Sequence, residues 1–275
     1  MDADACGGWR RGVLQLLCTA PQRHQSLRSF APRAVRHLQR QLRRRFAIGV
    51  LRPQKAGAGG RARQLDQPLS RGGRLMTALA DHAMEWMKSM QAGSREERVD
   101  LLFDYLHTHG QSSYDPSVTQ LEHALQTAHL AHQESQHPHL VVASLLHDIG
   151  HLMIDEHDEQ RDFLDQDCAH EAVAARALSV FFPTQVVAPV QRHVSAKRLL
   201  CSLDETYYAG LSDASQRSFA VQGGELSRSE AMRLLALEGM DDAMALRRWD
   251  DRAKVHGVEV PDLDAYGQVV LDHLL

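Results

Sequence analysis

Apolar residues recur at helical spacing along most of the chain from Met76 to the C-terminus, and no sustained alternation of period two occurs there. This pattern predicts an all-α protein folded as a compact helical bundle. The expected helices cover residues 94–107, 116–133, 138–152, 168–181, 183–197, 227–237, 241–254 and 261–275.

Capping residues mark several of the helix starts. Ser94 and Glu97 form an S-x-x-E capping box. Asp115 is expected to be an N-cap, with Pro116 at the first helical position. Between the helices, residues 155–167 are interpreted as an acidic loop, and residues 198–226 contain turns.

Charge divides the chain into two parts. Residues 1–74 carry 15 arginines and one lysine against three acidic residues, whereas the rest of the chain carries 15 basic and 32 acidic residues. The Arg-rich segment has three interpretations: a nucleic-acid or membrane arm, a transit-like leader, or upstream sequence included by a misplaced start codon. We favour the last, because Met76 opens a cleaner amphipathic segment. The expected organisation is a segment over 1–75, disordered or upstream of the true start, and one domain over 76–275.

The composition is that of a globular protein in a reducing compartment. No stretch of about 18 apolar residues is present, so no membrane span is expected. The four cysteines form neither a C-x-x-C pair nor an even framework, which favours a cytoplasmic location. We expect neither a membrane nor a nucleic acid as a partner, and the sequence gives no oligomeric state.

The most informative segment is LVVASLLHDIGHL, residues 140–152, where an apolar run ends in His147 and Asp148. An imidazole and a carboxylate at the end of a buried helix are costly unless they are paired, and a divalent metal is a common partner. The alternative is a histidine satisfied by an ordinary neighbour. His151 lies four residues after His147 and is expected on the same helix face.

Other potential ligands lie on helices with apolar faces: one histidine before the HD pair, and two histidines and an aspartate after it. Along the chain the potential ligands therefore follow the order H, HD, H, H, D. This set is enough for two ions that share the Asp148 carboxylate. Histidine with carboxylate suits iron, manganese or zinc, and open positions on each ion favour chemistry over a structural role. The predicted metal ligands are His123, His147, Asp148, His170, His193 and Asp250.

Two cations accompany these ligands. Lys197 lies four residues after His193, and Arg247 lies three residues before Asp250, so each shares a helix face with a predicted ligand. One interpretation is an anion clamp for phosphate or phosphonate oxygens. In the alternative, Arg247 only pairs with Asp250, and Lys197 is solvated.

The chain resembles the HD-domain mixed-valent di-iron oxygenases of phosphonate breakdown, the PhnZ-type enzymes. The resemblance covers about three fifths of the chain, from Tyr114 to the C-terminus. HVSAKR and LRRWDDRAK are its more specific motifs, since HD alone indicates only a superfamily made up mostly of phosphohydrolases. The motifs are QLEHALQTA around residue 123, LLHDIGH at 145–151, HE at 170–171, HVSAKR at 193–198, LSDASQR at 211–217, QGG at 222–224 and LRRWDDRAK at 246–254.

This resemblance implies a helical HD domain with a mixed-valent Fe(II)/Fe(III) pair and O2 as co-substrate. One iron would be held by His123, His147, Asp148 and Asp250, and the other by Asp148, His170 and His193. Tyr114 and His151 would be catalytic residues, and the pocket for a small 1-hydroxyphosphonate would include His151, Lys197, Ser215 and Arg247. The implied reaction is oxidative C–P cleavage to phosphate and a carboxylic acid.

One departure from the family pattern concerns the substrate. In the family, a tyrosine is followed three residues later by a glutamate that meets the amino end of the substrate. Here Tyr114 is followed by Asp115, Pro116 and Ser117, so no glutamate occupies that position. The role of a substrate amino group is therefore open, and we expect a weaker preference for an unmodified 2-amino group than in the family.

Two other function classes remain open from the sequence. A two-metal HD phosphohydrolase acting on a phosphate ester or nucleotide would use the same ligand order, with Lys197 and Arg247 on the phosphate. A non-catalytic helical domain that binds a metal or a partner is the third. The oxygenase is the leading hypothesis, and the identity of the metal would separate it from the hydrolase.

Overall fold

The described part of the chain begins with two helices, α4 (Asp81–Ala92) and α5 (Arg95–His109). The computed structural model describes residues 79–115, 117–135, 137–154 and 169–275. The predicted segment over 1–75, its boundary with the domain and the acidic loop at 155–167 lie outside these residues. The capping box before α5 is confirmed, because Ser94 Oγ accepts the N–H of Glu97 while the Glu97 carboxylate accepts the N–H of Ser94.

The next helix starts later than the sequence predicted. Asp115 is not a helix cap but the last residue of β1 (Ser113–Asp115), which pairs antiparallel with β2 (Val118–Thr119). The Oδ1 atom of Asp115 accepts the N–H groups of Ser117 and Val118, and this local turn replaces the expected helical start. A capping box of Thr119 and Glu122 then opens α6 (Gln120–Glu134).

The HD segment is divided into two helices where one was expected. Pro138 opens α7 (Pro138–Leu146), as predicted, but the helix stops before the HD pair and α8 covers Ile149–Met153. Asp148 has φ −104° and ψ 8°, outside the helical region, and acts as the N-cap of α8. The polar pair therefore occupies a junction between two short buried helices.

The C-terminal half is also helical. The helix expected to end at residue 197 continues to 203, and two helices occupy the region expected to contain turns. The remaining elements are α9 (His170–Leu178), α10 (Thr184–Leu203), α11 (Glu205–Ala209), α12 (Asp213–Val221), α13 (Arg228–Leu235), α14 (Met240–Arg252), the 3-10 helix η2 (Leu263–Tyr266) and α15 (Gly267–His273).

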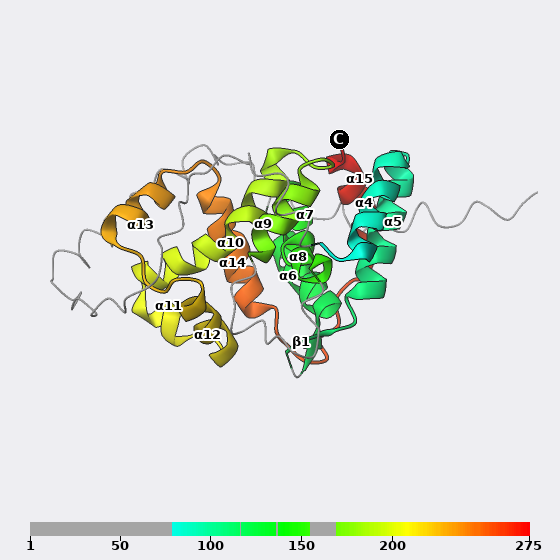
Figure 1. Cartoon of the computed structure of the whole chain (residues 1–275). Coiled ribbons are helices and arrows are strands. Elements are labelled where there is room, and N and C mark those ends of the chain that lie inside the picture. Colours follow the sequence, from blue (N-terminus) through cyan, green and yellow to red (C-terminus); the bar gives the residue numbers. More distant parts are fainter. Residues whose placement is uncertain (1–78, 116, 136, 155–168) are drawn as a thin grey trace, which may run out of the picture.

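In Figure 1, helices α4, α5 and α15 form one end of the molecule and α11 to α13 the other, with the long helices α10 and α14 between them. The central helix α7 packs against α6, α10, α14 and α15. Its residues 140–146 are all buried, which explains the unbroken apolar run in the sequence. The predicted all-α class is confirmed for the described residues, with one short β-hairpin added.

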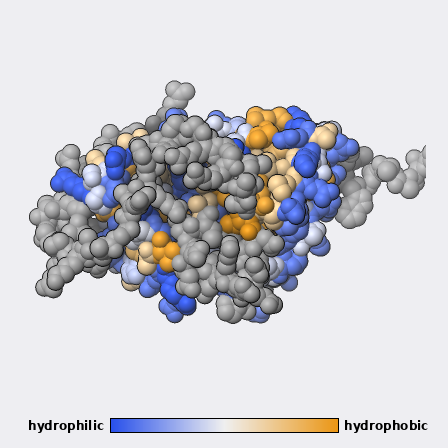
Figure 2. Space-filling model, viewed as in Figure 1, coloured by the Kyte–Doolittle hydropathy of each residue, from blue (hydrophilic) through white to orange (hydrophobic). Residues whose placement is uncertain are grey.

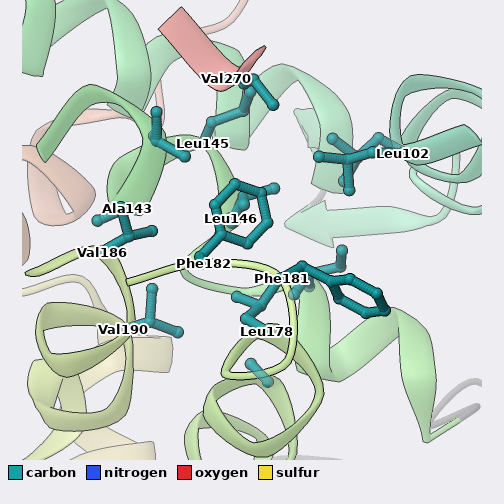
Figure 3. Close-up of a cluster of buried hydrophobic side chains, with 14 of the residues drawn as sticks. Leu102, Ala143, Leu145, Leu146, Leu178, Phe181, Phe182, Val186, Val190 and Val270 are labelled. Carbon is teal, nitrogen blue, oxygen red and sulfur yellow. The ribbon is translucent and has the colours of Figure 1, made fainter. Parts of the chain in front are cut away.

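A continuous apolar core fixes α7 in place. Phe181 and Phe182 follow α9 and are each 1% exposed. Figure 3 shows their side chains pointing apart, with Phe182 beside Leu146 and Val186. These large side chains lie at the turn that joins α9 to α10. Helix α10 packs against both α9 and α7, which sets the positions of the histidines on α9 and α10.

Figure 2 shows hydrophilic side chains at both ends of the described surface and a band of apolar side chains right of centre. Exposed large apolar side chains such as Val180, Met232 and Val255 are spread over different elements. Among the described helices, none combines the length and the apolar character needed to cross a membrane.

Candidate metal centre

Three side chains form a first group of potential ligands. His123 comes from α6, and His147 and Asp148 from the junction of α7 and α8. Their ligand atoms lie within 4.8 Å of one another. The Nε2 atoms of the two histidines are 3.2 Å apart, and Oδ2 of Asp148 lies 3.6 Å from His123 Nε2 and 3.2 Å from His147 Nε2.

A second group lies on the other side of Asp148. His170 at the first position of α9 and His193 in the middle of α10 bring their Nε2 atoms to 3.1 Å from each other. Oδ1 of Asp148 lies 3.5 Å from His170 Nε2 and 3.4 Å from His193 Nε2. The two oxygens of one carboxylate thus face two separate histidine pairs, as a carboxylate that bridges two ions would.

The hydrogen bonds of the imidazoles fit a metal at the first group. The Nδ1 atoms of His123 and His147 lie 2.7 and 2.8 Å from the carbonyl oxygens of Ala253 and Ser144. A carbonyl can only accept, so each Nδ1 carries a proton, and in a neutral ring Nε2 is a lone pair. Two lone pairs that face each other at 3.2 Å repel, and either a proton on one ring or a cation beside both removes this repulsion. Two nitrogens bound to one ion at about 2.1 Å would be about 3 Å apart, as these are.

The second group follows the same logic. Nδ1 of His193 lies 2.7 Å from the carbonyl oxygen of Val190, which leaves Nε2 for a ligand. Burial lowers the pKa of His170 to about 3 and also lowers the pKa of His193. Both rings are therefore neutral near pH 7, which is the form that binds a metal.

The buried carboxylates at the first group favour a positive charge beside them. Burial opposes protonation of His147, but Asp148 and Asp250 outweigh it and raise the pKa of His147 to about 8. Burial also favours the neutral form of Asp148, yet His147 and the histidine hydrogen bonds hold the pKa of this carboxyl well below its usual range. In the absence of an ion, the buried carboxylates hold a proton on His147, and a metal cation would supply that charge instead.

Asp250 on α14 lies beside the first group. Its Oδ1 atom is 3.5 Å from His123 Nε2, and its Oδ2 atom is 3.8 Å from His147 Nε2. Oδ1 is buried and has no hydrogen-bond partner, whereas Oδ2 accepts from Arg247 Nη1 at 2.6 Å. A buried carboxylate oxygen without a donor is costly, and a metal ion would satisfy it. All six predicted ligands are thus brought together, although Asp250 lies outside the two tightest groups.

Tyr114 and His151 each stack on a predicted ligand. The ring of Tyr114, from β1, lies 3.8 Å from the His123 ring at an interplanar angle of 10°. His151 stacks on His170 at 3.7 Å, and its Nε2 atom is 4.0 Å from Oδ1 of Asp148. Because the helix breaks at the HD pair, His151 lies with the second group and does not extend the face of His147. Both residues therefore border the centre.

The side of the site next to Asp250 is a wall of cationic and hydroxyl side chains, formed by Lys197, Arg247, Ser215 and Ser218. Lys197 and Arg247 are 3% and 5% exposed, so neither is a solvated surface charge. Lys197 Nζ donates to Ser218 Oγ at 2.8 Å. Ser215, on the same helix α12 as Ser218, is also buried.

Four residues of this region were not singled out from the sequence. Lys254 Nζ donates to Ser215 Oγ at 3.1 Å and lies 3.9 Å from Asp250 Oδ1. It sits four residues after Asp250, so the spacing argument that identified Lys197 could have found it. Ser218 lies on α12, which was not predicted as a helix. The other two, Asp251 and Tyr207, contact Arg247 and each other.

Apart from His151, the other histidines of the described residues lie outside the two groups of potential ligands. His157 lies outside the described residues. Nine described histidines are exposed or half-buried: His82, His107, His109, His129, His132, His137, His139, His256 and His273.

The comparisons with known proteins point to one reaction class. No model of a known protein family matches the chain. The chain is 52% identical over 170 residues to hydroxymethylphosphonate dioxygenase from Gimesia maris, an alignment that covers 62% of this chain and 85% of that protein. It is 33% identical over 177 residues to 1-hydroxy-2-(trimethylamino)ethylphosphonate dioxygenase (glycine-betaine-forming) from Leisingera caerulea, with 64% of this chain and 88% of that protein covered.

Proposed function

Because the chain belongs to the family of PhnZ-like phosphonate dioxygenases, we propose that it cleaves the C–P bond of a small 1-hydroxyphosphonate with O2. The products are inorganic phosphate and a carboxylic acid. For hydroxymethylphosphonate the acid is formic acid, and the equation balances with one O2 and no external reductant. The observation that carries this proposal is the 52% identity to hydroxymethylphosphonate dioxygenase.

The six predicted ligands are proposed to hold two iron ions. His123, His147 and Asp250 would bind one ion, His170 and His193 the other, and Asp148 would bridge them. The facing Nε2 atoms and the two-sided Asp148 carboxylate support this division. Bound as a mixed-valent Fe(II)/Fe(III) pair, the ions would supply the activation of O2.

The protein's own residues would bind and orient the substrate. Arg247, Lys197 and Ser215 are proposed to hold the phosphonate oxygens, because charged donors in a buried wall bind an anion more strongly than exposed ones. Lys254 adds a further cation to the same wall through its bond to Ser215.

The catalytic assignments of Tyr114 and His151 remain part of the proposal. Each covers a ligand histidine by stacking, so each excludes water from one side of the centre. His151 also lies near enough to Asp148 to contact a molecule bound beside it.

Substrates without an amino group are proposed to be preferred. Asp115, the carboxylate nearest in sequence to Tyr114, is engaged by the N–H groups of Ser117 and Val118 and by the Ser117 hydroxyl. Lys254 Nζ lies 5.4 Å from the Tyr114 ring, so one side of that ring already has a cation. A substrate ammonium group placed there would be repelled by Lys254.

The decisive experiment supplies iron-loaded protein with hydroxymethylphosphonate and isotopically labelled O2. We expect release of phosphate and formate, with label in the formate and no phosphate under strict anaerobiosis. Simple phosphate esters serve as the control substrates. Phosphate release from these esters without O2, together with no oxygen-dependent turnover of hydroxyphosphonates, would instead establish the two-metal phosphohydrolase.

A further inference from the structure

The guanidinium of Arg247 lies between two consecutive carboxylates of α14. Its Nη1 atom donates to Oδ2 of Asp250 at 2.6 Å. On the opposite edge, Nε donates to Oδ2 of Asp251 at 3.2 Å, and Nη2 donates to Oδ1 of Asp251. Arg247 is thus bound through two atoms by Asp251 and through one atom by Asp250.

These two carboxylates have different surroundings. Asp250 faces His123 and His147, and its buried Oδ1 atom has no donor. Asp251 faces away from the histidines toward Tyr207 of α11, whose hydroxyl donates to Oδ2 of Asp251. Burial favours the neutral form of Arg247, but Asp250 and Asp251 outweigh it and raise the pKa of the guanidinium, so the charge is retained.

A buried guanidinium attracts every carboxylate within reach. Arg247 precedes Asp250 by three residues on one helix, and without a second partner both oxygens of Asp250 could turn toward it. Oδ1 of Asp250 would then be lost to the histidine group. In the structure, Asp251 occupies the Nε–Nη2 edge of Arg247, and the Tyr207 hydroxyl donates to Asp251.

We propose that Asp251, supported by Tyr207, is a positioning residue that anchors Arg247 by its Nε–Nη2 edge and thereby keeps Oδ1 of Asp250 available to a metal ion. The same anchoring leaves two N–H groups of Arg247, one each on Nη1 and Nη2, for an anionic substrate. This inference rests on the proposed function only in treating Asp250 as a metal ligand. It concerns the competition between a cationic side chain and a metal for one carboxylate.

The competition can be measured without turnover, by titrating the metal-free protein with Mn(II) and following free Mn(II) by EPR. In Asp251→Asn, Arg247 loses its charged partner and pairs more fully with Asp250. We expect the affinity for the ion at the Asp250 side to fall by about tenfold, as the loss of a charged hydrogen-bond arrangement predicts. In the double variant Asp251→Asn/Arg247→Met, the competing cation is gone, and the affinity should return to within about threefold of wild type.

This recovery is the signature that separates positioning from general structural support. If Asp251 only stabilised the fold, removing Arg247 as well would weaken metal binding further. Tyr207→Phe keeps the ring packing and removes the hydroxyl that orients Asp251, so it should give a smaller loss that Arg247→Met also reverses. If Asp251→Asn does not fold, this second pair of variants carries the test.

Asp242→Asn is the matched control, because Asp242 lies on α14 and pairs with His139 away from the centre. It should bind Mn(II) as wild type does. Wild-type affinity in Asp251→Asn, or a double variant no better than the single one, would overturn the proposal. Failure of the proposed function would show separately, as absence of O2-dependent phosphate release from hydroxymethylphosphonate in a protein that binds two Mn(II) ions.

Discussion

Gly150 faces the backbone of His170 so closely that a Cβ atom on residue 150 would lie 2.0 Å from the His170 carbonyl oxygen. Real Cβ atoms do not approach oxygen to that distance, so only glycine fits. The contact joins α8 to the first residue of α9 and so fixes the position of His170 relative to Asp148. It also explains why the HD segment continues as Ile149-Gly150.

Gly150→Ala is therefore expected to push the start of α9 away and to weaken the ion held by His170 and His193. Overpacking of this kind costs about 1 to 3 kcal/mol of unfolding free energy. Metal content and thermal unfolding measure the two effects. Gly93→Ala is the control, because its Cβ would meet nothing closer than 3.4 Å. A Gly150→Ala protein with full metal content would contradict this view of the α8–α9 contact.

Asp148→Ala should lose both ions, since this carboxylate faces both histidine pairs. His170→Ala should lose only one, because His123 and His147 do not depend on it. Metal analysis after equilibration with iron distinguishes the two variants. Retention of one ion per chain in Asp148→Ala would show that the two groups bind independently.

Binding of an anion should depend on the charge of Lys197. Burial and the neighbouring Arg247 lower the pKa of Lys197 to about 7, so the ammonium form is present below that pH and is lost above it. The affinity for sulfate, whose own charge is constant here, should decrease as the pH rises from 6 to 8. Lys197→Arg stays charged and should remove this pH step while keeping affinity at pH 8. An unchanged step in Lys197→Met would show that another group titrates.

Replacing Lys197 or Arg247 by Ala should weaken phosphonate binding while metal content stays intact. A lost charged hydrogen bond costs about 1.5 to 3 kcal/mol. Calorimetric titration with a non-reactive phosphonate, beside metal analysis of the same sample, measures both quantities. If Arg247→Ala instead loses metal and the remaining holo-protein binds phosphonate normally, Arg247 serves Asp250 rather than the substrate.

Substrate preference should not favour a primary amine. We expect kcat/KM for hydroxymethylphosphonate to exceed that for 2-amino-1-hydroxyethylphosphonate, because Asp115 is engaged in its own turn. Asp115→Asn should leave the ratio unchanged. Strong selectivity for the primary amine, lost in Asp115→Asn, would mean that this carboxylate reaches the substrate after all.

The sequence could predict that the six proposed ligands lie together, because four of them lie on helices with an apolar face and the other two directly follow the apolar helix α7. It also predicted the helix ends at Ser94, Pro138 and Ser227, where local capping decides the boundary. The predicted start of α6 was wrong because two capping signals compete within five residues: Thr119 and Glu122 form the capping box of the helix, while Asp115 accepts backbone N–H groups of the turn before it.

Contacts between distant segments were not predictable. The break between His147 and Ile149 places Asp148 between two histidine pairs, and one of these pairs comes from α9 and α10. Similarly, Asp251 reads as the second half of an acidic pair until α11 brings Tyr207 to it. Helical spacing predicts which residues share a face of one helix, whereas the roles of Asp148 and Asp251 depend on contacts between helices.

The six proposed ligands come from α6, the α7–α8 junction, α9, α10 and α14, and they span more than a hundred residues of sequence. The ions bound to them would cross-link these helices, including α14, which follows α10 only after three other helices. Since metal would bind the folded chain and not the dispersed ligands, unfolding free energy should rise with the logarithm of free metal concentration, by about 1.4 kcal/mol per tenfold increase for each site above its Kd. The centre would thus stabilise the helical bundle as well as carry out the reaction. Melting temperatures recorded with and without a chelator would therefore differ.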